Sequence, residues 1–189
     1  MKKLNLILIS LGLSFSHQVL AAQQAHLDEA RSLAKQFGGQ LQPELGKAMK
    51  AGGPINAISV CHTKAPQIAA ELSEKSGWII NRVSLKNRSP KGEPDGWETV
   101  MLQKFEAQLA DGADPKTLEH SAMVQEGGQT TFRYMKAIAI GPNQPCLHCH
   151  GAQINDGVKQ KLNELYPNDK AVGYQAGQIR GAFSFQKPL

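Results

Sequence analysis

Two cysteines and one histidine near the C-terminal end follow the spacing C-x-x-C-H, at Cys146, Cys149 and His150. This spacing is typical of covalent haem c attachment. Two thiols held this close on one turn of chain can add across the two vinyl groups of a haem. The histidine that follows is then held against the iron as an axial ligand. The motif therefore predicts one covalently attached haem c.

Three other uses of a C-x-x-C motif fit this sequence less well. A dithiol redox site would open a helix directly after a strand, whereas here the loop Gly-Pro-Asn-Gln-Pro precedes the motif. A zinc site would need a further pair of ligands at zinc spacing, and the sequence offers none. A disulfide between Cys146 and Cys149 would close too small a loop to stabilise the chain much.

A second axial ligand is expected, because haem iron accepts two and His150 supplies one. Cys61 and His62 are adjacent, and successive side chains on a helix point about 100° apart, so only one of them can face a haem. Cys61 shares an apolar stripe with Ala57 and Ile58, which favours the cysteine. His62 as the ligand, and an inert buried thiol at Cys61, stay open as alternatives. The remaining candidates are His26, His120, Met49, Met101, Met123 and Met135.

The first residues have the form of an export signal. Two lysines precede the apolar run 4–15, and a small-residue exit for signal peptidase ends at Ala21. The run is shorter than the roughly 20 residues that span a bilayer, which favours cleavage near Ala21 over a retained anchor. We expect residues 1–21 to be a signal peptide and residues 22–189 to be a single periplasmic domain with no membrane span.

Composition narrows the classes of function. The chain of 189 residues carries 21 Lys and Arg against 16 Asp and Glu, and its formal net charge of +5 falls to +3 once the two lysines of the signal are removed. Basic residues are scattered among acidic ones and aromatic residues make up 6%, so a nucleic-acid partner is not expected. No Ser-His-Asp arrangement and no paired acidic site is visible in the sequence, and we do not expect an enzyme.

The spacing of apolar residues predicts helices first and strands later. The expected helices are 23–37 ended by Gly38-Gly39, 43–50, 54–75 with an end or kink at Pro66, 97–110 and 158–166. Strands are expected over 78–85 and 178–185, and a hairpin over 118–140 that turns at Gly127-Gly128. This order favours an α+β fold over a parallel α/β sheet.

Four segments carry a more specific pattern than the haem motif does. They are A-I-S-V-C-H-T-K-A-P-Q-I-A, N-R-V-S-L-K-N-R-S-P-K-G-E-P-D-G-W-E, Q-P-C-L-H-C-H-G and Y-P-N-D-K-A-V-G-Y-Q-A-G-Q-I-R-G-A-F-S. With these segments the chain resembles a family of small periplasmic haem c proteins that have a PAS-like fold and Cys/His axial ligation. Relatives of this domain also form the sensor region of some bacterial signalling proteins.

The resemblance implies a PAS-like α+β fold in which a small antiparallel sheet is flanked by N-terminal helices, with the covalent haem in the pocket. It implies Cys146 and Cys149 as the thioether cysteines, and Cys61 as the iron ligand opposite His150. His62 departs from the family pattern, where a small or polar residue is expected after the ligand cysteine, and leaves ligand exchange open.

Three cations in the second segment are further candidates for the site. Arg82, Lys86 and Arg88 alternate along the expected strand and its exit. Such cations can pair with haem propionates through charge-assisted hydrogen bonds. Ordinary solvated strand residues are the alternative interpretation.

Together these features predict a periplasmic haem c protein that acts in redox or small-ligand sensing. A thiolate ligand donates electron density to iron, which favours the ferric state and a low potential, and its lability on reduction suits a switch. A low-potential electron-transfer cytochrome is the alternative, and a haem enzyme such as a peroxidase comes third. The expected partners are a redox or signalling protein and a small molecule at the iron.

Overall fold

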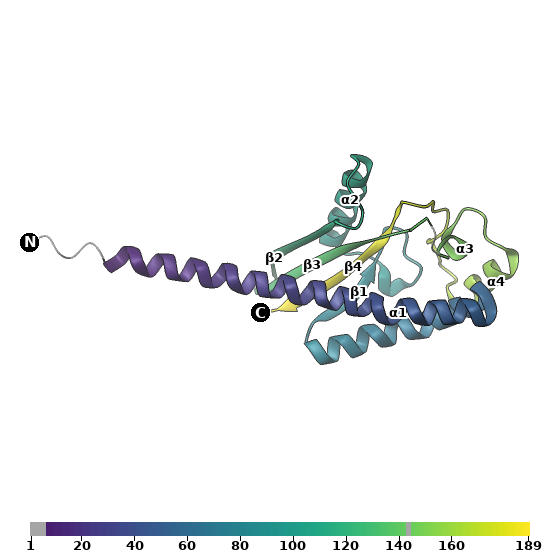
Figure 1. Cartoon of the computed structure of the whole chain (residues 1–189), viewed down its shortest axis with the longest axis horizontal. Helices are drawn as coiled ribbons and strands as arrows, with labels where there is room; N and C mark the ends of the chain where they lie inside the picture. The colour runs from purple at the N-terminus through teal and green to yellow at the C-terminus, as the bar shows by residue number, and fades with distance from the viewer. Residues whose placement is uncertain (1–6, 143–144) are drawn as a thin grey trace, which may run out of the picture.

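The N-terminal part of the chain forms a helical hairpin. The computed structural model describes residues 7–142 and 145–189, with side chains from residue 20 onward. In α1 (Ile7–Ser76) two helical arms run antiparallel, side by side (Figure 1). The reversal lies at Gly52 and Gly53, where Gly53 has a φ of 65° that glycine adopts without a steric penalty. Pro54 opens the second arm, a position that suits proline.

The helix break predicted at Gly38-Gly39 is wrong, and Pro66 does not end the helix. Phe37, directly before the two glycines, is 1% exposed in the core. Its packing outweighs the helix-propensity penalty of about 1 kcal/mol for each glycine. The helices predicted over 23–37 and 43–50 are therefore one arm.

The predicted cleavage point at Ala21 lies within this first arm. The charged start of the predicted signal peptide, in residues 1–6, lies outside the described residues, and cleavage stays a prediction. Within the described ranges, no helix combines the length and the apolar character needed to cross a bilayer.

Four antiparallel strands form one sheet. They are β1 (Ile79–Val83), β2 (Glu119–Glu126), β3 (Gln129–Ala139) and β4 (Ile179–Pro188), in the order β1-β4-β3-β2. The last strand of the chain thus lies inside the sheet, between β1 and β3. The predicted strands and the hairpin with its two-glycine turn are confirmed, and so is the α+β class with helices beside an antiparallel sheet.

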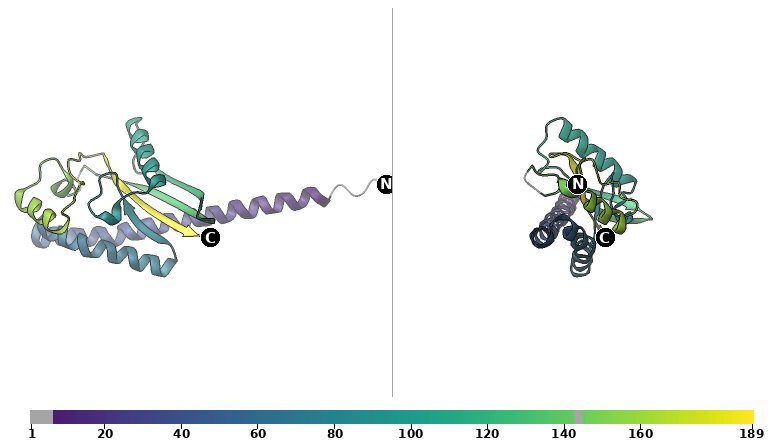
Figure 2. Two further views of the ribbon diagram at one scale, coloured as in Figure 1. Left: turned by 180° about the vertical axis from the view of Figure 1, so that it is seen from behind. Right: turned by 90° about the vertical axis from the view of Figure 1, so that its right-hand side faces the viewer.

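The sheet separates α1 from α2 (Gly96–Ala110), which lie on opposite faces (Figure 2). Because successive strand residues point to opposite faces, Phe132 and Tyr134 pack toward α1 while Met135 packs toward α2. The two faces of β3 are therefore both covered. Helix α2 opens with a capping box between Asp95 and Glu98, a motif that fixes where a helix begins.

Three short elements complete the fold: η1 (Pro90–Gly92) lies beside β1, and α3 (Leu147–His150) and α4 (Asp156–Leu165) lie against α1. The loop after β1 contains η1, a 3₁₀ turn. The motif forms α3, and α4 follows it along the chain (Figure 1). Ile58 of α1 packs with Val158 and Leu162 of α4. The predicted helix over 158–166 is confirmed in position and begins two residues earlier than expected.

Charged contacts tie both helices to the sheet. Arg31 of α1 donates to Glu119 of β2 over 2.9 Å, and the hydroxyl of Tyr134 donates to the same carboxylate over 2.8 Å. Burial raises the pKa of Glu119, but these two hydrogen bonds outweigh it and hold the pKa below its ordinary value. On the other face, buried Arg133 ion-pairs with Asp95 at the start of α2 over 2.6 Å.

Candidate functional site

A cavity of about 740 Å³ lies between α1, one end of the sheet and the segment that carries the C-x-x-C-H motif. Its volume is within the range of cofactor sites, about 300–1,000 Å³. Cys61 from the second arm of α1 lines this cavity together with Cys146, Cys149 and His150. The fold therefore brings the cysteine of the first segment to the motif near the other end of the chain.

The ring of His150 is held by one short hydrogen bond. Its Nδ1 lies 2.7 Å from the carbonyl oxygen of Ala171, and a carbonyl only accepts, so Nδ1 carries the proton and Nε2 keeps its lone pair. Burial lowers the pKa of His150 well below its ordinary value, and the cations Arg180 and Arg88 lower it further. A neutral imidazole with its lone pair on Nε2 is a form that binds metal.

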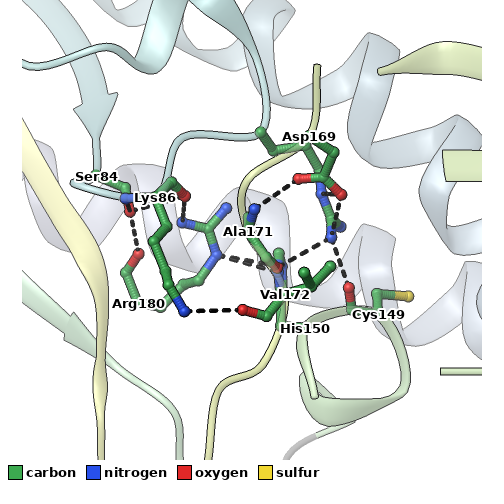
Figure 3. Close-up of polar contacts among 9 residues, drawn as sticks. Ser84, Lys86, Cys149, His150, Asp169, Ala171, Val172 and Arg180 are labelled. Carbon is green, nitrogen blue, oxygen red and sulfur yellow. Dashed lines mark hydrogen bonds and ion pairs between the residues drawn. The ribbon is translucent and has the colours of Figure 1, made fainter. Parts of the chain in front are cut away.

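Arg88 connects the motif to the loop that carries this carbonyl, the loop in which Asp169, Ala171 and Val172 lie (Figure 3). Its guanidinium donates to Asp169 over 3.0 Å, to the carbonyl of Cys149 over 2.5 Å and to the carbonyl of Ala171 over 3.3 Å. The carboxylate of Asp169 in turn accepts from the backbone N–H of Ala171 over 2.8 Å. The side chains of the Arg88–Asp169 pair are largely shielded from solvent, at 13% and 7% exposed.

Cys61 and His62 have different surroundings, as their positions on α1 require. Cys61 is half-buried and lines the cavity; burial raises the pKa of its thiol, and Arg82 and Arg88 partly offset that rise. His62 is exposed and packs its ring edge-on against Tyr166, with 5.1 Å between ring centroids. The apolar stripe on α1 thus places the cysteine at the cavity and the histidine outside it.

The three cations predicted from the second segment are not equivalent. Arg82 lines the cavity and lies 5.3 Å from the centroid of the Phe37 ring. Arg88 also lines it, but its donors are engaged as described above. Lys86 is exposed and not part of the lining; it donates to the carbonyl of Val172 over 3.0 Å.

A comparison with family models identifies the family of this chain. A model of the family described as Tll0287-like, Tll0287, matches residues 14–188. The chain belongs to the Tll0287-like family. The family resemblance predicted from the four sequence segments is thereby confirmed. A comparison with curated proteins gives no match.

One solved structure supports the same fold for this member of the Tll0287-like family. The chain is similar to the cyanobacterial heme-protein Tll0287, with a TM-score of 0.61 and 23% sequence identity. The match covers 87% of this chain and 93% of that one. At this identity the likeness supports the shared fold, and the site has to be argued from this chain's own residues.

Arg180 is a site residue that the sequence patterns did not identify. The pairing of β3 with β4 shifts between Ile138 and Ala139, and Arg180 is the unpaired residue on β4. Such a bulge re-aims a side chain, and here the Nε of Arg180 lies 3.1 Å from Nδ1 and 3.4 Å from Nε2 of His150. Burial lowers the pKa of Arg180 to about 10. Gly181, directly after it, is the available signal, since glycine inside a strand often marks a bulge.

The lining of the cavity fits a large, flat, partly charged group such as a haem in this member of the Tll0287-like family. Three thiols and an imidazole with its lone pair on Nε2 can bind such a group, and Arg82 and Arg180 supply positive charge. Gly38 of α1 also lines the cavity, and a Cβ at this position would meet no atom within 4 Å. The first arm of α1 therefore leaves open space at the cavity wall.

Proposed function

We propose that this protein binds one haem c, attached covalently through Cys146 and Cys149, with His150 and Cys61 as the axial ligands of the iron. The observation that carries the proposal is the convergence of Cys61, Cys146, Cys149 and His150 on one cavity. Homology to a heme-protein supports haem binding in general. His62 is disfavoured as the ligand because its ring is exposed beside Tyr166.

The cavity cations suggest how the charged edge of the haem is bound. Arg82 and Arg180 line the cavity and contact mainly aromatic rings and the His150 ring, so we assign the propionates to these two. Guanidinium groups suit carboxylates, because their planar donors allow two parallel hydrogen bonds. Lys86 and Arg88, which the sequence also suggested, have other partners.

In the biological role that we propose, the protein acts in redox or small-ligand sensing. The haem supplies a one-electron centre, and a thiolate ligand lowers its potential. Cys61 lies on α1, whereas the cysteines that attach the haem lie in the motif. Another ligand can therefore replace Cys61 at the iron while the haem stays covalently attached. The partners we propose are a redox or signalling protein and a small molecule at the iron.

An electron-transfer cytochrome of low potential is the second candidate. His148, between the two motif cysteines, is exposed, so the attachment segment lies at the protein surface. Electron transfer needs such proximity of the centre to a docking partner.

We propose the periplasm as the location in either case, with the mature N-terminus near residue 22. Mass spectrometry of the exported protein checks this N-terminus, and an intact Met1 would contradict the proposal.

The decisive experiment combines extraction with spectroscopy. After denaturation and acid–acetone extraction, the haem colour should stay with the polypeptide, and it should be lost when both motif cysteines are replaced by alanine. Haem that extracts freely from the wild-type protein would refute covalent attachment. A visible spectrum of both oxidation states with and without carbon monoxide then separates the two roles: carbon monoxide binding on reduction supports ligand sensing, and a six-coordinate iron in both states supports electron transfer.

A further inference from the structure

His150 depends on a carbonyl that is not part of any helix or strand. Ala171, whose carbonyl accepts from Nδ1 over 2.7 Å, lies in the irregular segment between α4 and β4. Further along the same segment, the N–H groups of Gly173 and Tyr174 donate to the carbonyls of Gly151 and His150, and the Ala171 carbonyl lies outside this pairing. What holds it therefore decides how well the imidazole is oriented.

Arg88 contacts the chain on both sides of this hydrogen bond. The Nη2 of Arg88 donates to the carbonyl of Cys149, directly before His150, and also to the carbonyl of Ala171. Asp169 completes the arrangement, since it accepts from the Nε of Arg88 over 3.0 Å and from the N–H of Ala171 over 2.8 Å. The donor and acceptor sides of the His150–Ala171 bond are thus tied to the same guanidinium.

We propose that Arg88, paired with Asp169, is the positioning residue of His150. The pair fixes the carbonyl of Ala171, and thereby the tautomer and the plane of the imidazole. This inference rests on the proposed function, in which His150 is an iron ligand. It replaces the propionate role that the sequence suggested for Arg88.

The chemistry gives the direction of the effect. A hydrogen bond from Nδ1 to a fixed acceptor raises the basicity of the ligand nitrogen, and losing such an outer partner costs about 10–100-fold in metal affinity. A more basic imidazole favours the ferric form. We expect loss of the pair to reduce the ferric preference of His150 about tenfold, which corresponds to a rise in potential of about 59 mV for one electron.

Geometry and charge can be separated by four variants of the holoprotein. Arg88→Lys keeps the charge but not the planar fork of donors, and Arg88→Gln removes both. Asp169→Asn removes the other partner. Lys86→Gln is the matched control, because it removes a nearby cation that donates to Val172 and not to Ala171. The readouts are covalent haem content, reduction potential, the ferric electron paramagnetic resonance spectrum and the melting temperature.

We expect Arg88→Lys and Asp169→Asn to raise the potential and change the ferric spectrum, while Lys86→Gln leaves both near wild type. Arg88→Gln should change the ferric spectrum too, but its potential should rise less than in Arg88→Lys, because losing a cation beside His150 favours the ferric form. A lower melting temperature with unchanged potential and spectrum in Arg88→Lys would overturn the proposal, as would an equal shift in Lys86→Gln. Folded variants at Arg88 and Asp169 that all lack haem would also overturn it, since the pair would then act before ligation. A wild-type protein without covalent haem is a different result, and it refutes the proposed function.

Discussion

Two adjacent glycines in the first arm of α1 offer a test of the cavity with an internal control. Gly38 lines the cavity and Gly39 is exposed, and at neither position would a Cβ meet an atom within 4 Å. Both lie inside a helix, where alanine is favoured over glycine by about 0.5–1 kcal/mol. Without a cofactor, Gly38→Ala and Gly39→Ala should therefore stabilise the chain equally.

The holoprotein should separate the two variants. Gly39→Ala should raise the free energy of unfolding by about 0.5–1 kcal/mol, or the melting temperature by about 1–4 °C for a domain of this size. At Gly38 the new methyl group enters the space assigned to the haem, and overpacking costs about 1–3 kcal/mol. We expect the gain to disappear or reverse in Gly38→Ala, with a shifted haem absorption band.

Thermal unfolding and the visible spectrum of both holoproteins provide the measurement. Circular dichroism confirms that each variant keeps its helix content. Equal stabilisation by the two substitutions, with identical haem spectra, would show that the wall at Gly38 does not face the cofactor. The assignment of the haem to this cavity would then be wrong.

Three further predictions follow from other parts of the structure. Gly181→Ala would place a Cβ 2.3 Å from the carbonyl oxygen of Val83, so denaturant unfolding should show a loss of about 2–4 kcal/mol from overpacking and weakened strand pairing. The pKa of Glu119 is lowered in the folded protein, so its stabilising contribution is complete above the ordinary value of 4.5 and is lost as the pH falls through the lower folded value. Glu119→Gln should therefore lose less stability than the wild-type protein as the pH is lowered, and an unchanged dependence of stability on pH would contradict this. Cys61→Ala should alter the ferric spectrum and raise the potential, while His62→Ala leaves the ferric spectrum nearly unchanged; the opposite pattern would make the iron bis-histidine.

The strands were predictable from sequence because their signals are local. Alternating residues and a two-glycine turn determine the β2–β3 hairpin, and the same period identifies β1 and β4. The helices predicted over 43–50 and 54–75 leave a gap at the observed reversal, but the break predicted at the other glycine pair, Gly38-Gly39, does not form. The pair at Gly52-Gly53 is followed by Pro54, which disfavours helical geometry in the residue before it. That neighbouring proline was the available signal.

The candidate site was predictable where one helix face or one motif determines it. The apolar stripe separates Cys61 from His62, and the structure places them on different sides of the cavity wall. The contacts of Arg88 were not predictable, since its partners Asp169 and Ala171 come from a loop whose path depends on the whole fold. Arg180 was missed because a bulge breaks the alternation that strand patterns assume.

The position of β4 also constrains the order of events during synthesis. A chain is made from its N-terminal end, and β4 comes last although it fills the middle of the sheet. Until it arrives, β1 has no strand to pair with among those described, and one side of β3 is bare. The cavity wall from Arg180 to Phe183 is missing for the same time. Pairing of Ile79 with Gln186 joins distant parts of the chain, which makes folding slow, so the nascent protein exposes its motif cysteines before it has a closed cavity around them.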